Sequence, residues 1–283
     1  MKISVVIPCL NAESLLPVAL EALTRQSRAP WEVIVADNGS TDGSREAALS
    51  FSGRLPRLQV VDGSARRGAA AARNAGAARA TGDCLAFCDA DDEVDERWLE
   101  ALTAALSEHD FVASRLEFSR LNEPTSYRHE QETGLQLLQF GFLPHASGSG
   151  LAIRRRVFEA AGGFDEDVRF HEDTAFCWKL HLAGTPLGFA DAAVVHLRRR
   201  GSASGALRQA RSWAACEVLL YRRFRDAGMP PPRNGNALRE WLRMPRMLLQ
   251  SVRGRRSWYG FCWHFGTRLG RAQGSLTYRT LML

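Results

Sequence analysis

The chain opens with Ile3-Ser4-Val5-Val6-Ile7-Pro8, a β-branched run that ends at a proline. Such a run is typical of a strand that is buried on both faces of a sheet. Residues 13–26 carry leucines and alanines at helical spacing, and a second strand is predicted at residues 32–36. The alternation continues with a helix from Ser44, a strand at 58–61, a helix at 68–80, a strand at 84–88 and a helix at 95–107. Strands separated by helices predict right-handed βαβ units, hence an α/β fold with a mainly parallel sheet flanked by helices.

The rest of the chain shows a less regular pattern followed by a helical one. Strands are predicted at residues 111–118 and 150–153, helices at 156–161 and 172–183, and short apolar runs stand at 187–190 and 193–197. From Ser204 the pattern is helical, with an interruption at Pro230-Pro231-Pro232 and amphipathic segments at 238–252 and 258–269. We therefore expect an α/β domain over residues 1–200, with halves of about 1–110 and 111–200, and a helical extension over residues 201–283.

The charge of the chain is unevenly distributed. The formal net charge is +6, and because Lys2 and Lys179 are the only lysines, 35 of the 37 basic residues are arginines. In the first domain the arginines alternate with acids, so we predict no nucleic-acid partner. After residue 197 the arginines have few acidic neighbours, as in the run 198–200. This excess indicates either an anionic ligand or membrane surface as a partner, or a solvated face.

Cysteine usage and hydropathy bear on the compartment. The six cysteines show no Cys-x-x-Cys pair and no zinc-like spacing with histidine. The apolar run at residues 3–7 is too short for the core of a signal peptide, and no stretch reaches the ~18 apolar residues that span a bilayer. We predict a cytoplasmic protein, with peripheral contact at the inner face of the membrane left open.

The densest group of acids follows the fourth predicted strand. Asp89, Asp91, Asp92 and Glu93 occupy four of five successive positions. An acid at a helix N-terminus explains one of them but not four. A divalent cation would relieve their mutual repulsion, and oxygen-only ligands suit Mg²⁺ or Mn²⁺. The cluster therefore predicts a metal site beyond the carboxyl end of a parallel strand, where ligands bind in such sheets.

Three further places have both a structural and a functional interpretation. Asp37 and Asn38 open a polar loop after the second strand, which is either an ordinary turn or part of a ligand site. Glu172 and Asp173 enter a predicted helix, where the helix dipole favours acids, but a carboxylate there would also serve as a general base. His196 ends an apolar run and is either a structural histidine or a metal ligand.

Taken together, these segments resemble the family 2 glycosyltransferases, inverting enzymes of the Rossmann-like GT-A fold that use nucleotide sugars. The matching segments stand in the family's order and cover about the first 200 residues. They are Val5-Val6-Ile7-Pro8-Cys9-Leu10-Asn11-Ala12-Glu13, Val35-Ala36-Asp37-Asn38-Gly39-Ser40-Thr41-Asp42, Gly68-Ala69-Ala70-Ala71-Ala72-Arg73-Asn74-Ala75-Gly76, Gly82-Asp83, Phe87-Cys88-Asp89-Ala90-Asp91-Asp92, Gly162-Gly163-Phe164-Asp165 and Glu172-Asp173. The segment from Ala193 to Arg200 is similar to a variant that many bacterial members carry.

The resemblance implies a role for each matching residue on the donor side. Arg73 would lie beside the nucleotide, and Asp89 would contact the ribose. The nucleoside pocket would be lined by Pro8, Asn11, Glu13, Asp37 and Asn38.

The resemblance also implies the metal site, the anion site and the base. Asp91 would hold the metal that bridges the diphosphate, and His196 would complete its ligand set. An arginine of the run 198–200, Arg198 or Arg200, would meet the diphosphate. Asp173 would be the general base, with Glu172 as the close alternative.

The activity implied is transfer of a sugar from a nucleoside-diphosphate sugar, with UDP-sugars favoured, to a carbohydrate, lipid-linked or small-molecule acceptor. A nucleotidyltransferase is the first alternative, but it would show a glycine-rich basic loop after the first strand, where this chain has Pro8-Cys9-Leu10-Asn11. A non-catalytic nucleotide- or sugar-binding module is the second, and it would not need both the acidic cluster and the pair at 172–173.

The helical extension is rich in aromatic and aliphatic residues beside arginines. One interpretation is a membrane surface that brings the chain to a lipid-linked acceptor. The other is that these side chains pack onto the catalytic domain or onto a second subunit, as in a homodimer. The residues concerned are Trp241, Leu242, Met247, Leu248, Trp258, Phe261, Trp263 and Phe265.

Overall fold

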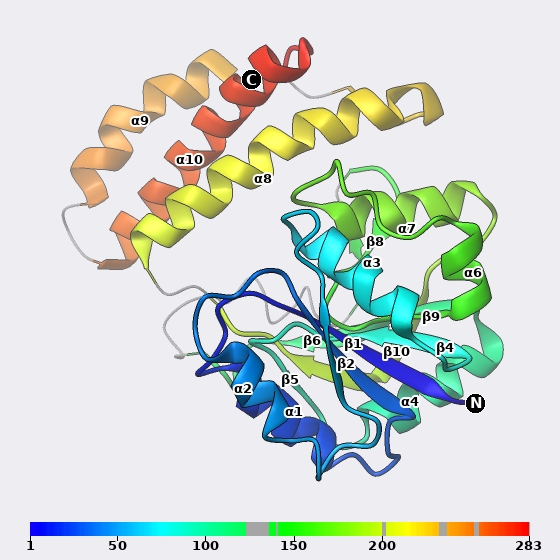
Figure 1. The fold of residues 1–283 in the computed structure, drawn as a ribbon. Helices are drawn as coiled ribbons and strands as arrows, with labels where there is room; N and C mark the ends of the chain where they lie inside the picture. The colour runs from blue at the N-terminus through cyan, green and yellow to red at the C-terminus, as the bar shows by residue number, and fades with distance from the viewer. Residues whose placement is uncertain (123–135, 140, 200–201, 232–236, 252–254, 283) are drawn as a thin grey trace. The chain divides into compact units, whose positions relative to one another are not determined.

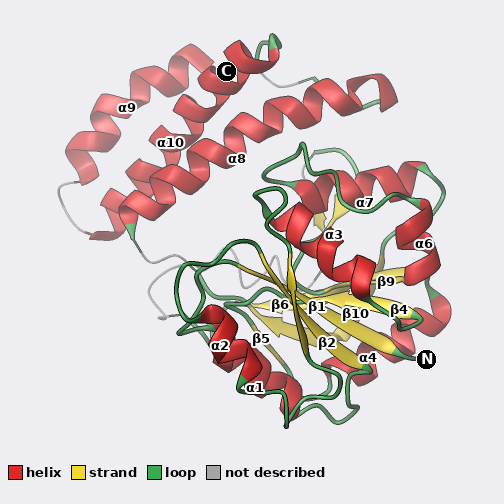
Figure 2. Cartoon of the chain, viewed as in Figure 1, coloured by secondary structure: helices red, strands yellow, loops and turns green. Residues whose placement is uncertain are grey.

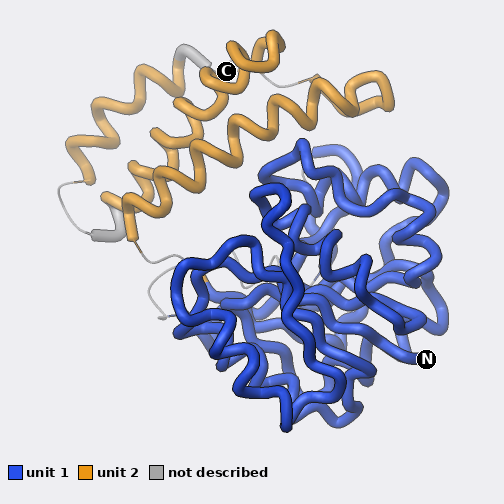
Figure 3. Tube along the Cα trace, in the orientation of Figure 1, with its two compact units in different colours: residues 1–198 blue, residues 199–283 orange. Residues whose placement is uncertain are grey.

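The computed structural model describes the chain except for residues 123–135, 140, 200–201, 232–236, 252–254 and 283. The chain forms two compact units, residues 1–198 and residues 199–283 (Figures 1 and 3). The first unit is a sheet with helices on both faces, and the second is made of helices (Figure 2).

The first unit is built on one eight-stranded sheet. The parallel pairs are β3–β2, β2–β1, β1–β4 and β6–β10, and the antiparallel pairs are β4–β9, β9–β6 and β10–β5. In sheet order the strands are β3 (Gln59–Asp62), β2 (Glu32–Asp37), β1 (Ile3–Cys9), β4 (Cys84–Phe87), β9 (Leu151–Arg154), β6 (Phe111–Glu117), β10 (Gly188–His196) and β5 (Glu93–Val94). A separate two-stranded sheet pairs β7 (Leu138–Gln139) with β8 (Pro144–His145).

The buried strands supply apolar side chains to a core on each face of the sheet. Along β1, Val5 and Ile7 belong to one core, and Val6 belongs to the other. This alternation is the period-two geometry of a strand, so one run of apolar residues serves two layers. The first core is covered by α1 (Leu16–Thr24), α2 (Ser44–Leu49) and α4 (Trp98–Glu108), and the second by α3 (Ala69–Arg79), α6 (Arg155–Ala160) and α7 (Glu172–Leu182).

Two details of the strands differ from the sequence prediction. Pro8 was expected to end the first strand, but β1 continues through Pro8 to Cys9. The missing N–H is tolerated there because β1 pairs with β4 only as far as Val6, so one side of the strand has already lost its partner. The apolar runs 187–190 and 193–197 contribute to one strand, β10, because an irregularity between Ala190 and Val194 takes up the three residues between them.

The second unit is helical, and its two longest helices run parallel, because successive glycines of one meet successive turns of the other. It contains α8 (Ala203–Phe224), a 3₁₀ turn η1 (Arg225–Ala227), α9 (Ala237–Ser251) and α10 (Arg255–Tyr278). Ser202 caps α8 by accepting a hydrogen bond from the Gly205 N–H at 3.1 Å. Among the described residues, no helix is long and apolar enough to cross a membrane.

Helix α10 runs well beyond the segment 258–269 that its sequence pattern predicts. Three glycines spaced by four residues lie where α10 meets α8. A Cβ at Gly266 would lie 2.5 Å from the Leu207 carbonyl oxygen, one at Gly274 would lie 2.6 Å from the Ala215 carbonyl oxygen, and one at Gly270 would overlap the Arg211 carbonyl oxygen. Glycine is a poor helix former, but here it lets two helix backbones approach closely, so packing overrides propensity.

Candidate active site

The candidate site residues lie where the parallel strands end. Asp37 is the last residue of β2, and Cys9 is its partner in β1. The acidic segment 89–92 follows β4 on the other side of β1. The topology of the sheet therefore gathers segments that are far apart in the sequence at one edge (Figure 2).

The loops after β1 and β2 are fastened to each other by two of the predicted nucleoside-pocket residues. Asn11 Oδ1 accepts a hydrogen bond from the Thr41 N–H at 2.8 Å, and Glu13 Oε2 accepts one from the Gly43 N–H at 3.1 Å. Asn11 itself has a φ of +50°, a left-handed conformation that asparagine tolerates. Both side chains thus shape the loops in this structure, and their contact with a nucleoside stays a prediction.

The neighbouring residues at the end of β2 also bind backbone groups. Asp37 Oδ1 accepts a hydrogen bond from the Ser40 N–H at 2.8 Å. Asn38 is buried, and its Oδ1 accepts one from the Gly68 N–H at 2.9 Å, which fixes the segment that leads into α3. Pro8 lies in β1 opposite Ala36. The structure therefore brings the predicted nucleoside-pocket residues together as one loop framework.

Three aspartates after β4 form a compact group of potential metal ligands. One carboxylate oxygen from each of Asp89, Asp91 and Asp92 lies within 4.8 Å of the others. Asp92 is buried, and its pKa is raised well above its ordinary value, first by burial and then by the charges of Asp89 and Asp91. Three carboxylates this close together repel one another when all are ionised. A bound divalent cation would relieve that repulsion.

Arg198 connects the end of β10 to this acidic loop. Its backbone N–H donates to Asp92 Oδ1 at 2.9 Å, and its Nε donates to the Asp91 carbonyl oxygen at 3.2 Å. The predicted anion-binding residue therefore lies beside the predicted metal ligands. Arg200, the other predicted anion-binding residue, lies outside the described residues.

A buried arginine joins the two acidic segments of the site. Arg73, on α3, has a side chain that is 3% exposed, and it contacts Asp89 Oδ1 through Nη2 and Glu172 Oε1 through Nη1, each at 2.7 Å. Burial alone would lower the pKa of Arg73, but attraction by Asp89 and Glu172 raises it above its ordinary value. Arg73 is therefore a permanent cation that holds α3, the loop after β4 and α7 together.

The site includes a glycine that the sequence prediction missed. A Cβ at Gly148 would lie 2.5 Å from Arg73 Nη2, so any larger residue would displace the guanidinium. The Gly148 N–H also donates to Asp173 Oδ2 at 2.7 Å. Gly148 lies in the segment 119–150, which carries no motif, so only the folded structure identifies it.

Glu172 and Asp173 begin α7 but face different surroundings. Glu172 is buried, and burial together with the charge of Asp173 raises the pKa of Glu172 to about 7, against the lowering effect of Arg73. Asp173 is half-buried, and its two oxygens accept hydrogen bonds from the N–H groups of Gly148 and Thr174, each at 2.7 Å. One carboxylate is therefore paired with a cation, and the other is oriented by backbone donors.

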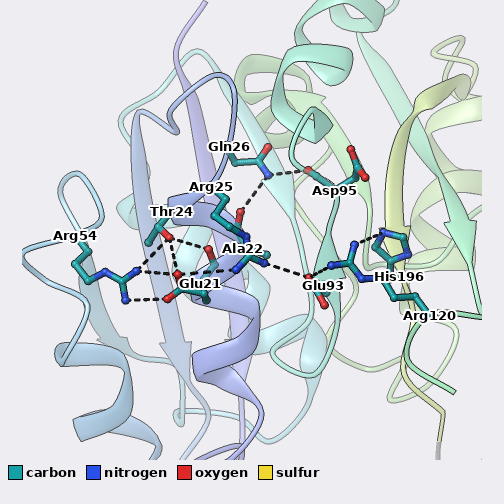
Figure 4. Close-up of polar contacts among 10 residues, drawn as sticks. All are labelled: Glu21, Ala22, Thr24, Arg25, Gln26, Arg54, Glu93, Asp95, Arg120 and His196. Atoms are coloured by element: carbon teal, nitrogen blue, oxygen red, sulfur yellow. Dashed lines mark hydrogen bonds and ion pairs between the residues drawn. The ribbon is translucent and has the colours of Figure 1, made fainter.

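His196 is held by a second polar network (Figure 4). Its Nδ1 lies 2.7 Å from Glu117 Oε2, and its Nε2 lies 3.3 Å from Arg120 Nη1. Arg120 also donates to Glu93 Oε1 at 2.7 Å, so it lies between Glu93 and His196. Burial alone would raise the pKa of Glu117, but hydrogen bonds from Ser119 and His196 lower it to about 2.

This network bears on the predicted metal role of His196. In the described part of the chain, the close group of potential ligands comprises the three aspartates 89, 91 and 92, without His196. To ligate a metal, the imidazole would have to exchange Glu117 or Arg120 for the ion. That role stays a prediction. Glu117 and Arg120 are polar partners that no motif in the sequence indicated, and Glu93, the fourth acid of the sequence cluster, lies in this network and not in the close group of aspartates.

The chain is similar to known proteins over most of its length. Residues 4–162, more than half of the chain, match the family described as glycosyl transferase family 2. This chain belongs to glycosyl transferase family 2. A related description, glycosyl transferase family group 2, matches residues 86–269 and so continues into the second unit. The resemblance noted from the sequence motifs is confirmed.

Curated proteins show moderate identity to the chain. Glycosyltransferase AglE of Haloferax volcanii is 31% identical over 194 residues, which are 66% of this chain and 64% of AglE. Succinoglycan biosynthesis protein ExoA of Rhizobium meliloti is 32% identical over 199 residues, which are 66% of this chain and 60% of ExoA. The chain thus spans less than two thirds of these relatives.

Solved structures of glycosyltransferases share the fold. Mannosyltransferase PcManGT from Pyrobaculum calidifontis, in complex with GDP-Man and Mn²⁺, has a TM-score of 0.65 at 20% identity, over 98% of this chain and 86% of that chain. S. aureus TarS 1–349, in complex with UDP-GlcNAc, has a TM-score of 0.55 at 19% identity, over 99% of this chain and 92% of that chain. The predicted GT-A fold with C-terminal helices is confirmed.

Proposed function

We propose that this family 2 member transfers a sugar from a nucleoside-diphosphate sugar to a hydroxyl group of an acceptor, with inversion at the anomeric carbon. The observation that carries the proposal is the buried Arg73, which joins Asp89 of the acidic cluster to Glu172 beside Asp173. A non-catalytic binding module would need neither this linkage nor a second acidic pair. Two solved structures of the same fold, in complex with GDP-Man and UDP-GlcNAc, support the class of donor.

The acidic cluster fits a divalent cation by its chemistry. Its three potential ligands are all carboxylates, and their crowding contributes to the raised pKa of Asp92. We infer that Asp91, with Asp89 and Asp92, would hold Mn²⁺ or Mg²⁺, whose positive charge would stabilise the departing diphosphate. Arg198 would add its own positive charge beside the same loop.

Asp173 is the better candidate for the general base. Glu172 is buried and paired with Arg73, so its carboxylate is already engaged by a cation. The Asp173 carboxylate is held by two backbone N–H groups, which fix its orientation and leave its remaining lone pairs for a proton. In the transfer step the acceptor oxygen bonds to the anomeric carbon, its proton moves to Asp173, and the bond to the diphosphate oxygen breaks on the opposite face.

The donor and the acceptor are proposed by class. Uridine is favoured as the nucleoside, with guanosine and thymidine as the competitors. A lipid-linked, carbohydrate or small-molecule acceptor would each present a hydroxyl group to the carboxylate base. The name of one curated relative, 34% identical over 90 residues, gives a diphosphoundecaprenol-linked sugar as its acceptor, which supports the lipid-linked class.

Calorimetric titration of UDP, GDP and dTDP into the full chain, with and without Mn²⁺, tests the proposal. Metal-dependent binding in the micromolar range that Asp91→Ala abolishes would support the donor site. The control Asp191→Ala removes an exposed aspartate on β10 that pairs with Arg115 and should bind as the wild type does. If the folded chain bound no nucleoside diphosphate, the proposal would be wrong.

Assays of turnover distinguish the proposed transferase from the nucleotidyltransferase and the binding module. Release of free nucleoside diphosphate with sugar transferred to an acceptor extract supports the proposal. Formation of a nucleotide sugar from a nucleoside triphosphate would indicate a nucleotidyltransferase. Donor binding without turnover over carbohydrate, lipid-linked and small-molecule acceptors would favour the binding module.

A further inference from the structure

The second unit is strongly basic. Residues 199–283 contain 17 arginines, no lysine and three acidic residues, a net charge of +14, whereas residues 1–198 carry −8. All three acids are already paired with arginines: Glu217 with Arg271, Glu240 with Arg243 and Arg268, and Asp226 with Arg225. The surplus positive charge therefore has no counterpart within the described part of this unit, and it favours an anionic partner.

One face of α9 combines this charge with exposed apolar side chains. Leu242 is 70% exposed, Leu249 is 73% exposed and Leu248 is 44% exposed. At about 100° per residue these three leucines fall within an arc of about 120°, and we call them the leucine face of α9. Arg239, Arg243 and Arg246 are exposed along one border of this arc.

The other side of α9 is occupied by the core of its own unit. Met244 is buried there, whereas Trp241, which lies next to Leu248 at the edge of the leucine face, meets Phe265 of α10 edge-to-face with ring centroids 6.5 Å apart. Phe261 stacks between Phe265 and Trp258 at centroid distances of 5.7 and 5.6 Å. Much of the aromatic content noted in the sequence is thus used for packing, whereas the leucine face is not.

We propose that the leucine face of α9 and its flanking arginines bind the surface of an anionic lipid bilayer. A helix with exposed leucines on one face and arginines beside them can insert its apolar side chains below the headgroups while the guanidinium groups meet lipid phosphates. Since no described helix can cross a membrane, the contact is at the interface. The inference does not require the proposed transferase activity.

Charge and chemistry distinguish this partner from two others. A symmetric dimer through this face would bring two units of +14 together, and like charges would repel. A nucleic acid would satisfy the arginines, but its phosphate backbone gives exposed leucines nothing to bind. Of these three partners, the bilayer surface is the one that offers anionic groups and an apolar layer at the same place.

Co-sedimentation of the full chain with sucrose-loaded vesicles tests the proposal. Vesicles of phosphatidylglycerol and phosphatidylcholine should bind the chain, vesicles of phosphatidylcholine alone should bind it at least about tenfold more weakly, and raised salt should weaken binding. The double variant Leu242→Ser/Leu249→Ser should lower the partition coefficient by about tenfold or more, because two leucines no longer enter the apolar layer.

Leu276→Ser is the matched control, because Leu276 is an 83% exposed leucine on α10 outside the leucine face. It should bind vesicles as the wild type does, and circular dichroism should show that each variant is folded. The proposal fails if the folded wild type does not bind anionic vesicles at low salt, or if the double variant binds as well as the control. It also fails if light scattering shows a dimer that only the double variant dissociates, or if the chain prefers single-stranded RNA to the vesicles.

Discussion

Replacing Arg73 by methionine should destabilise the first unit strongly and in a pH-dependent way. The substitution keeps an unbranched side chain but removes the cation that contacts Asp89 and Glu172, each at 2.7 Å. An ion pair of about 4 Å at an effective dielectric constant of about 20 is worth ~4 kcal/mol before desolvation. Removing one partner of a buried pair costs about 3–5 kcal/mol, because the remaining group must either stay as an unpaired charge or take up a proton. We expect a loss in this range at pH 8.

The pH dependence follows from Glu172. The pKa of Glu172 is raised to about 7 in the folded protein, above its unfolded value, so the stabilising proton is present at low pH and is lost as pH rises through about 7. Without Arg73 this pKa rises further, so Glu172 stays protonated in the variant where the wild type has ionised. At pH 6 Glu172 is largely neutral in both proteins, and the cost of the substitution should fall to about half.

Urea unfolding followed by circular dichroism at pH 6 and pH 8 measures these differences. With a slope of about 2 kcal/mol/M, the midpoint should shift by roughly 1 to 2 M at pH 8. Adding Glu172→Gln to Arg73→Met should recover part of the loss at pH 8, since a neutral amide does not need to take up a proton to avoid an unpaired charge. Arg66→Met is the control, because Arg66 forms an exposed pair with Asp167 and should cost less than about 1 kcal/mol. Equal losses at both pH values, with no recovery in the double variant, would refute the reasoning.

Three further predictions concern the base, the metal and the second unit. Asp173→Asn should lower turnover about 10²- to 10⁴-fold while calorimetry shows little change in UDP affinity, and a parallel loss of binding would count against a base. Mn²⁺-dependent UDP binding should strengthen from pH 5.5 to pH 8, because the raised pKa of Asp92 means that a proton must leave before a cation binds; a flat profile would contradict this. Gly270→Ala should lower the thermal midpoint of the helical signal, because its Cβ would overlap the Arg211 carbonyl oxygen, whereas Gly260→Ala, with open space at the Cβ, should leave the midpoint unchanged or raise it.

The sequence predicts the part of the fold that depends on local pattern. The alternation of apolar runs and helical stripes places β1, β2, β4 and the helices between them within a few residues of their observed bounds. The two-residue strand β5 escapes prediction, because it exists only through pairing with β10. The length of α10 escapes it as well, because Gly266, Gly270 and Gly274 are favourable only against α8.

The candidate site likewise has one part that the sequence predicts and another that depends on the folded structure. The acids at 89–92 and 172–173 stand out as clusters in the sequence, and the parallel sheet explains why the first cluster lies at a strand end. The contact of His196 with Glu117, 79 residues away, has no signature in either segment. Nor does the sequence show that Asn11 and Glu13 bind loop backbone in this structure, since that depends on how two loops meet.

The two halves of the site meet at one guanidinium group. Asp89 belongs to the predicted metal cluster, Glu172 adjoins the proposed base, and Arg73 contacts both while almost wholly buried. In such surroundings a change of charge at one carboxylate is poorly screened and is felt by the other through their shared partner. A cation bound by the aspartates would attract Asp89 and so weaken its ion pair with Arg73. The ion pair between Arg73 and Glu172 would then strengthen, which favours the ionised form of Glu172. Because Gly148 both makes room for Arg73 and donates to Asp173, the orientation of the proposed base depends on the same arrangement.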